Sequence, residues 1–315
     1  MPSNDMTATH YVAPLDETPL VAVDRVDESA KTRSAWTDAW DSLRTSPMFW
    51  ISAVLIVLIL LVAIVPQLFT HTSPTLGCDL DFSNASPRAG HPLGFTRQGC
   101  DVYARVIYGT RASLTVGILA TVIFALVGLI IGAVAGYYGG WLDAVVSRLG
   151  DIFFSVPSVL GAIVLMSVLP FRNATTVALV LAVFTWPQAA RIVRGAVVLA
   201  KNSDYVLSAK ALGVSRFKIL LRHVVPNSIA PLIVLATVSL GSFIVAEATL
   251  SFLGIGLPPS VMSWGNDISQ AQASIRTAPM SLFYPAVALS ITVLAFLMLG
   301  DVVRDALDPK ARANR

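Results

Sequence analysis

The sequence predicts an all-α, polytopic membrane protein with six transmembrane helices. Of its 315 residues, 55% are hydrophobic and 13% are charged, whereas about a quarter of the residues of a soluble globular chain are charged. Six uncharged runs of about 20 residues each are long enough to cross a hydrocarbon core of about 30 Å. They cover residues 48–69, 112–134, 152–169, 174–190, 226–246 and 282–300.

The positive charges predict how these helices are oriented. Six crossings place both termini on one side, and all but six of the 22 Lys and Arg residues then lie on that side. By the positive-inside rule, we expect a multi-pass protein of the plasma (inner) membrane with both termini in the cytoplasm. The net charge of +3 is not gathered in basic clusters with interleaved aromatic residues, so no nucleic-acid partner is expected.

The chain before the first apolar run is expected to contribute no core. Residues 1–34 are polar and mixed in charge, which predicts a disordered cytoplasmic tail, and no signal-peptide pattern precedes the first apolar run. In residues 35–47, Trp36, Trp40 and Leu43 recur at helical spacing. This favours an interfacial helix on the lipid surface, although a frayed start to the first membrane helix explains the same pattern. The transmembrane domain then covers residues 48–304, followed by a cytoplasmic tail over residues 305–315.

The outer loop, residues 70–111, contains both cysteines of the chain, Cys78 and Cys100. Two cysteines in one loop on the oxidising side of the membrane favour a disulfide over two free thiols. Closing a loop of about 20 residues would stabilise it by about 3 kcal/mol in the chain-entropy model.

Glycine and proline residues predict how two of the helices are built. Glycines recur at multiples of about four along the second helix, so this face is expected to pack on protein and not on lipid; they are Gly117, Gly128, Gly132 and Gly136. Pro157 interrupts the third helix, and neighbouring groups must satisfy the carbonyls that it frees. It is interpreted as either a fixed bend or a gating kink.

Glu247 lies at membrane depth in the fifth helix, so its carboxylate should face protein or water. It either lines a translocation pathway or bonds to a neighbouring helix. After Pro258 and Pro259, an apolar stripe at helical spacing predicts a surface helix on the outer face; its residues are Trp264, Ile268, Ala271 and Ile275.

The loop over residues 191–226 is basic and amphipathic. Asp204 can cap a short helix that carries Tyr205, Ala209 and Leu212 on one face. Gly213 should end that helix, because glycine accepts a left-handed backbone without steric cost. The helix is expected to resume over residues 214–223, and Pro226 can occupy the first turn of the next membrane helix. A solvated loop would explain the charge alone, but the apolar face and the glycine stop favour a helix that docks on a partner.

This loop resembles the cytoplasmic loop of binding-protein-dependent ABC importer permeases that couples them to the ATPase. Gly213 and Pro226 keep the spacing of that family and Ala209 takes its second alanine, whereas Leu207 replaces its glutamate and Ser208 its first alanine. The resemblance assigns the ATPase-coupling role to Tyr205, Leu207, Ser208, Ala209, Leu212, Gly213 and Phe217.

Further segments are similar to the dipeptide, oligopeptide and nickel branch of this family. Before the second membrane helix the matching residues are Leu93, Gly94, Gly99, Asp101, Tyr108, Gly109 and Arg111. In the same segment, Phe95, Thr96 and Cys100 depart from the family pattern. Residues 251–256, 263–266 and 300–309 look much like the corresponding family segments, so the resemblance extends from about residue 48 to the end of the chain.

The resemblance implies the transmembrane domain of a type I ABC importer that moves dipeptides or short oligopeptides by alternating access. It implies a homologous second permease subunit, two cytoplasmic ATPase subunits and an extracytoplasmic substrate-binding protein. The chain has no phosphate-binding loop, catalytic motif or clustered metal ligands. It is therefore not expected to be an enzyme or to hold a cofactor, with ATP and Mg on the ATPase subunits. A nickel importer is the alternative within transport, and a channel or scaffold subunit without ATP coupling is the alternative from another class.

Overall fold

The computed structural model describes residues 35–307, and the predictions for residues 1–34 and 308–315 lie outside this range. The described chain is all-helical and contains no strand, which confirms the expected fold class. Its α-helices, joined by short 3-10 and π turns, are α1 (Ala35–Thr45), α2 (Pro47–Ile64), α3 (Val102–Tyr138), α4 (Gly140–Ser155), α5 (Ser158–Val168), α6 (Ala174–Ala200), α7 (Asp204–Ala211), α8 (Arg216–Ile219), α9 (Val225–Ser228), α10 (Ala230–Phe252), α11 (Trp264–Ala271) and α12 (Met280–Leu307).

Five of these helices are each long and apolar enough to cross a membrane: α2, α3, α6, α10 and α12. The sixth expected crossing is not one straight helix over residues 152–169. In its place lie α4 and α5, which are bent by 84° at the break before Ser158 and make a sixth crossing only if the pair counts as one span. Pro157 explains the break, because proline donates no backbone hydrogen bond and disfavours a helical residue before it.

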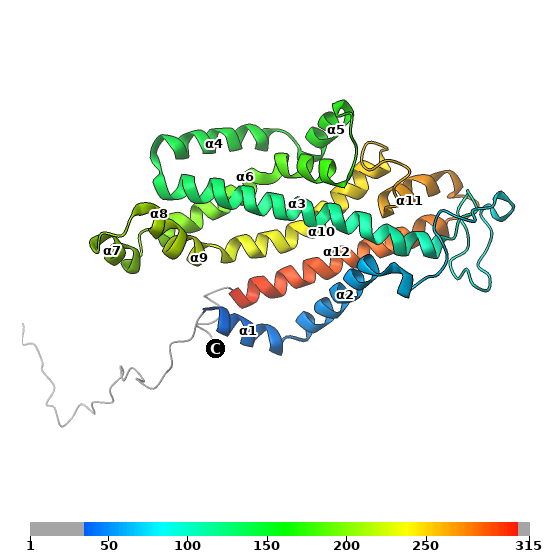
Figure 1. Ribbon diagram of the computed structural model, residues 1–315, viewed down its shortest axis with the longest axis horizontal. Helices are drawn as coiled ribbons and strands as arrows, with labels where there is room; N and C mark the ends of the chain where they lie inside the picture. The colour runs from blue at the N-terminus through cyan, green and yellow to red at the C-terminus, as the bar shows by residue number, and fades with distance from the viewer. Residues whose placement is uncertain (1–34, 308–315) are drawn as a thin grey trace, which may run out of the picture.

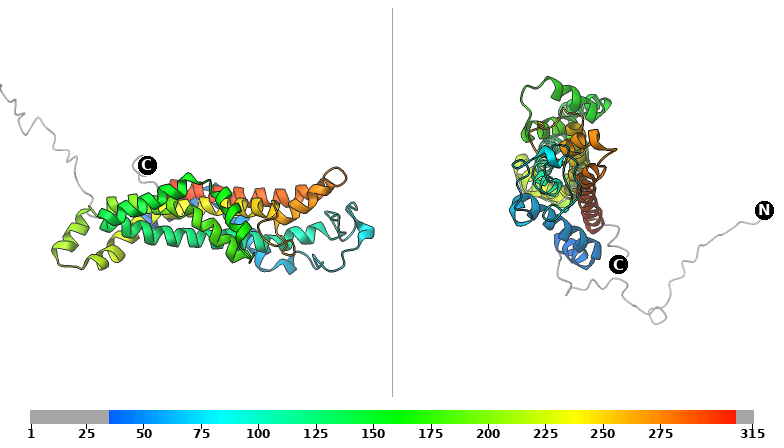
Figure 2. Two further views of the ribbon diagram at one scale, coloured as in Figure 1. Left: turned by 90° about the horizontal axis from the view of Figure 1, so that it is seen from above. Right: turned by 90° about the vertical axis from the view of Figure 1, so that its right-hand side faces the viewer.

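The bundle is elongated in Figure 1 and in the left view of Figure 2, with α3 running through most of its length. One end carries α7 and α8, and we call it the α7 end. The other carries the loop with Cys78 and Cys100, and we call it the disulfide end. Helix α1 packs against α12, so the first and last described helices meet on one side of the bundle, toward the α7 end (Figure 1).

The glycine stripe of α3 faces protein, as predicted. A Cβ atom on Gly128 would lie 2.2 Å from the Cβ of Ala189, and one on Gly132 would lie 2.4 Å from the carbonyl oxygen of Ala190. Side chains at these positions would therefore push α3 and α6 apart. Gly117 faces Ile244 of α10 in the same way. Small residues allow α3 to pack closely against two neighbouring helices.

Helix α1 is separate from α2, because Ser46 between them has an extended backbone and Pro47 begins the next helix. Trp36 and Trp40 are about half exposed, and the ring of Trp40 meets the ring of Phe49 edge-on. This arrangement leaves two tryptophan rings at the bundle surface. Their contact with lipid headgroups stays a prediction.

Helix α11 is not the surface helix that its apolar stripe suggested. Trp264 is only 2% exposed, and its indole Nε1 donates to the carbonyl oxygen of Val106 at 3.1 Å. Gly265 touches α10 so closely that a Cβ there would lie 2.6 Å from the carbonyl oxygen of Ala248. Ile275 is exposed and lies beyond the end of α11. The helix is inserted at the disulfide end, in contact with α3, α10 and α12.

Candidate functional site: the α7 surface

Helix α7 forms where the sequence predicts it, with one difference at its first residue. Ser203 is the N-cap and Asp204 is the first helical residue, where its charge still favours the helix dipole. Gly213 follows the helix with φ +76, and its N–H donates to the carbonyl oxygen of Lys210 at 3.0 Å. The left-handed glycine stop is therefore confirmed.

The connection from α7 to α10 is more broken than expected. After Ser215 the chain resumes as α8, continues as a π-helical turn over Leu220–Val224, and enters α9 with Pro226 in its first turn. The membrane helix α10 does not begin at Pro226 but at Ala230, after Ile229 separates it from α9. The sequence missed this because Pro226 is compatible with the first turn of either helix.

The two sides of this connection differ in burial. Val206, Ile219 and Val224 are fully buried and belong to the main hydrophobic core. The opposite side exposes Tyr205, Leu207, Leu212 and Phe217, with Leu212 as much as 84% exposed. We call these four exposed side chains the α7 surface. Ser208 and Gly213 are also exposed.

Ala209 is not on the α7 surface, although the sequence placed it on one face with Tyr205 and Leu212. It is 8% exposed and packs into the core of its own chain. Its small side chain fits there because α7 lies against the rest of the connection on that side. The exposed residues of α7 therefore include Tyr205, Leu207 and Ser208, with Leu212 after its last turn.

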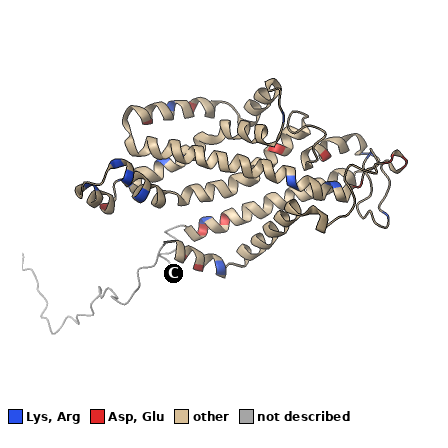
Figure 3. Ribbon diagram, in the orientation of Figure 1, with Lys and Arg blue, Asp and Glu red and all other residues tan. Residues whose placement is uncertain are grey.

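Positive charge surrounds the α7 surface, as the blue residues over α7 and α8 indicate (Figure 3). Asp204 is the only acidic residue from α7 to α9, whereas the same segment contains Lys210, Arg216, Lys218 and Arg222. Exposed apolar side chains with a charged rim are typical of a protein interaction site. The rim should attract a partner with acidic groups around an apolar groove.

The base of α7 is held to α3 and α4. Lys201, just after α6, donates through Nζ to the carbonyl oxygen of Gly136 at 2.7 Å. About two helical turns earlier, Arg194 forms a bidentate ion pair with Asp143 of α4, with Nη2 and Oδ2 2.6 Å apart. A force on α7 would therefore be transmitted to α3 and α4 as well as along α6.

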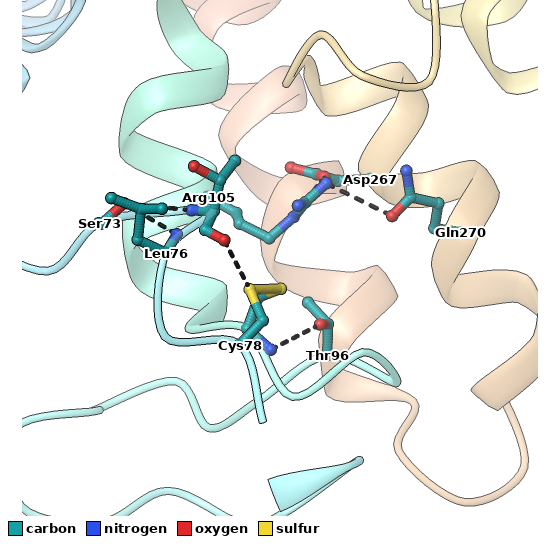
Figure 4. The surroundings of a disulfide bond; sticks show 9 residues. Ser73, Leu76, Cys78, Thr96, Arg105, Asp267 and Gln270 are labelled. Atoms are coloured by element: carbon teal, nitrogen blue, oxygen red, sulfur yellow. Dashed lines mark hydrogen bonds and ion pairs between the residues drawn. A yellow bond between two sulfur atoms is a disulfide. The ribbon is translucent and has the colours of Figure 1, made fainter. Parts of the chain in front are cut away.

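At the disulfide end, the structure joins Cys78 and Cys100 in a disulfide bond (Figure 4). The next residue, Asp101, is the N-cap of α3 and accepts from the N–H of Ala104 at 2.7 Å. Its other oxygen pairs with His91. The disulfide thus fixes the loop directly before the longest helix of the described chain.

Sequence reasoning missed the ion pair between Arg105 of α3 and Asp267 of α11, which Figure 4 shows close to the disulfide. Burial raises the pKa of the Asp267 carboxyl group, and the Arg105 guanidinium opposes this by stabilising the charged form. Because the two residues are separated by 162 positions in the sequence, no local pattern indicates the contact.

Glu247 is fully buried between α3, α10 and α11. Its Oε1 accepts from the hydroxyl group of Ser251 at 2.8 Å, and the hydroxyl groups of Ser113 and Ser263 lie next to the same carboxyl group. Among the described residues, its other oxygen has no partner. These contacts support the packing interpretation of Glu247. Residues 35–307 contain no group of three or more His, Cys, Asp or Glu that could hold a metal ion.

Comparison with known proteins covers nearly the whole chain. Residues 128–313 match the family model described as binding-protein-dependent transport system inner membrane component. Residues 34–87 match the N-terminal TM domain of oligopeptide transport permease C.

The chain is also similar to curated permease proteins along most of its length. It is 36% identical over 300 residues to the glutathione transport system permease protein GsiD of Escherichia coli O6:K15:H31, which covers 95% of this chain and 97% of that protein. It is 36% identical over 288 residues to the oligopeptide transport system permease protein OppC of Bacillus subtilis, with coverages of 90% and 92%. The glutathione permease protein of Pectobacterium atrosepticum is 33% identical over 294 residues, with coverages of 93% and 97%.

Proposed function

Because the chain belongs to the family of binding-protein-dependent transport system inner membrane components, as an ABC importer permease subunit of the peptide and glutathione type, we propose that it carries dipeptides or short oligopeptides into the cytoplasm. Glutathione is a tripeptide, so the relatives named for glutathione and for oligopeptides support one substrate class.

The observation that carries the proposal is the α7 surface, which exposes four apolar side chains on a short helix beyond the membrane-length helices. Exposed apolar patches with a polar rim mark interaction sites. In this proposal the partner is one of two ATPase subunits, which hold ATP and Mg. The residues that contact it are Tyr205, Leu207, Ser208, Leu212 and Phe217, with Gly213 setting the end of α7. Because Leu207 stands where the resembled family has a glutamate, this contact lacks that carboxylate.

The other partners follow from the same assignment. A homologous second permease subunit completes the membrane part, and an extracytoplasmic substrate-binding protein delivers the peptide at the disulfide end. The α7 end, with its excess of Lys and Arg, then lies in the cytoplasm together with both termini. The membrane is the plasma (inner) membrane.

The mechanism is alternating access driven by the ATPase subunits. Their closure on ATP moves α7, and the contacts of Lys201 with Gly136 and of Arg194 with Asp143 carry that motion into α3 and α4. The membrane helices then change from an inward-facing to an outward-facing arrangement and receive peptide from the binding protein. This chain binds no nucleotide and performs no chemical step in the cycle.

The test is uptake of radiolabelled dialanine, glutathione and Ni²⁺ by cells that lack only this chain. We expect uptake of at least one peptide to be lost and then restored by the wild-type chain, with nickel uptake unchanged. Loss of nickel uptake alone would show that the transported substrate is a metal ion and not a peptide. A channel subunit would differ again, because its passive conductance would not depend on the ATPase subunits.

The coupling role has its own test in the assembled complex. Gly213→Asp should uncouple ATP hydrolysis from transport, because aspartate holds a backbone with φ +76 less readily than glycine and adds charge beside the α7 surface. If that variant kept full substrate-stimulated ATPase activity, α7 would not be the coupling element.

A further inference from the structure

The α7 surface is open in the described chain. Leu212 is 84% exposed and Phe217 is 63% exposed, so no segment of residues 35–307 covers them. Four basic side chains of the same segment are exposed as well and form no ion pair within residues 35–307; they are Lys210, Arg216, Lys218 and Arg222. An uncovered apolar patch with a basic rim is an interaction surface whose occupant lies outside this range.

The chain itself contains a segment of opposite charge before residue 35. Residues 204–228 contain four basic residues and one acidic residue, a net charge of +3. Residues 1–29 contain one basic residue, Arg25, and six acidic residues, a net charge of −5; the acidic residues are Asp5, Asp16, Glu17, Asp24, Asp27 and Glu28. The other end of the chain does not match, because residues 308–315 contain three basic residues and one acidic residue. Of the two ends, the N-terminal segment therefore complements the basic rim.

Apolar residues alternate with the acidic residues in this segment. Residues 11–15 read YVAPL and precede Asp16 and Glu17, and residues 20–23 read LVAV and precede Asp24. A segment with apolar side chains next to carboxylates complements both parts of the α7 surface, its apolar centre and its basic rim. A purely acidic segment would complement the rim alone and leave the apolar patch exposed.

The α7 surface lies within reach of this segment. Helix α1 begins at Ala35 and packs against α12, toward the α7 end (Figure 1). Leu15 precedes Ala35 by 20 residues, and a chain of 20 residues extends for up to about 65 Å. The 37-residue helix α3 is shorter, at about 55 Å. Because the segment is tethered, its effective concentration at the α7 surface is on the order of 1 mM, so a weak contact is enough for occupancy.

We propose that residues 11–24 dock on the α7 surface while no ATPase subunit is bound, and that an ATPase subunit displaces them. The inference rests on the proposed function for the ATPase subunit and adds regulation to the same surface. The segment covers the apolar patch of a subunit that has not yet assembled. Because only chains with an uncovered α7 surface bind the ATPase subunit, the apparent affinity for that subunit is reduced in proportion.

Disulfide cross-linking in the full chain tests the contact, because the two native cysteines already form a disulfide. Thr18→Cys places a thiol between the two apolar groups of the segment, and Ser208→Cys places one on α7 without removing an apolar side chain. Leu199→Cys is the matched control, because Leu199 is 77% exposed at the end of α6 and lies outside the α7 surface. The thiols are oxidised with copper phenanthroline in lipid nanodiscs, and peptide mapping measures the yield.

Without ATPase subunits, we expect Thr18→Cys/Ser208→Cys to cross-link at least five-fold more than Thr18→Cys/Leu199→Cys. Neutralising the three acidic residues of residues 11–24, as Asn or Gln, should remove most of this excess. Adding ATPase subunits should lower the yield and protect Ser208→Cys from maleimide. Equal yields of the two cysteine pairs would overturn the inference.

Deletion of residues 2–29 measures the competition. We expect ATPase subunits to bind the shortened chain at least five-fold more tightly than the full chain. A tail of full length with its six acidic residues neutralised should behave like the deletion. Unchanged or weaker binding by both variants would overturn the inference.

The cross-linking results also separate this inference from the proposed function. Protection of Ser208→Cys by ATPase subunits, without preferential cross-linking to Thr18→Cys, would reject the tail contact and leave the proposed function intact. Preferential cross-linking that bound ATPase subunits leave unchanged, with Ser208→Cys still reactive, would reject α7 as the ATPase contact and with it the displacement.

Discussion

Arg105 and Asp267 form a buried ion pair that joins the start of α3 to α11, and the Arg105 Nε donates to Asp267 Oδ1 at 2.9 Å. The same guanidinium group also reaches Gln270. The second oxygen of Asp267 has no partner among the described residues. The carboxylate therefore depends on Arg105 for its charge compensation.

Arg105→Met should destabilise the subunit by about 3–5 kcal/mol, because it leaves a buried carboxylate unpaired. Thermal unfolding of the purified complex measures the loss. The matched control is Arg44→Gln, which removes an exposed pair with Asp41 and should change stability by about 1 kcal/mol or less. The double variant Arg105→Met/Asp267→Leu should recover part of the loss. Equal losses of thermal stability in Arg105→Met and Arg44→Gln would show that the buried pair contributes no more to stability than the exposed pair.

Cys78→Ser should lower the stability of the loop at the disulfide end by about 3 kcal/mol in the chain-entropy model. Cys100→Ser should have a similar effect, and the double variant should add little, because either single change already opens the bond. Hydrogen exchange of the loop and the intact mass without reductant measure the two consequences. A native mass that does not increase on reduction would show that the thiols are free.

Gly213→Ala should weaken the coupling of ATP hydrolysis to transport. A Cβ atom on Gly213 would meet nothing within 4 Å, so the effect comes from the backbone alone. Holding alanine at φ +76 costs about 1–2 kcal/mol. Gly195→Ala is the control, because its Cβ would also meet nothing within 4 Å and its position inside α6 favours alanine. The ratio of peptide imported to ATP hydrolysed should fall for Gly213→Ala only.

Glu247→Ala should destabilise the subunit, because the hydroxyl group of Ser251 loses its acceptor and each unsatisfied buried group costs about 1–3 kcal/mol. Glu247→Gln keeps the shape and an acceptor oxygen, so thermal stability and peptide uptake should both stay close to wild type. Uptake lost in Glu247→Gln with unchanged thermal stability would instead place the carboxylate in the translocation pathway.

The features that the sequence predicted correctly depend on a residue's own backbone or on local spacing. Gly213 ends a helix because of its conformational freedom, Pro157 breaks one because it lacks an N–H, and the glycines of α3 lie on one face because of the helical period. Such properties are independent of the rest of the fold. The paired cysteines also required only their shared loop.

The features that it missed depend on contacts between distant segments. The stripe of α11 fits a surface helix or a buried one, and the close contact of Gly265 with Ala248 decides between them. Ala209 has the spacing of the outward face of α7, yet its side of the helix meets the core. No pattern within one helix predicts what the opposite segment will be. The same holds for Arg105 and Asp267.

Helix α3 has 37 residues and contains no proline and no break, so it extends for about 55 Å at 1.5 Å per residue. Its first turn lies beside the disulfide, and its last turn carries the carbonyl oxygen that Lys201 holds at the base of α7. Because no proline and no break interrupts α3, a tilt of this helix would displace both of its ends together. Thermodynamic reciprocity then applies. If docking at one end favours a given tilt, docking at the other end becomes easier by the same factor.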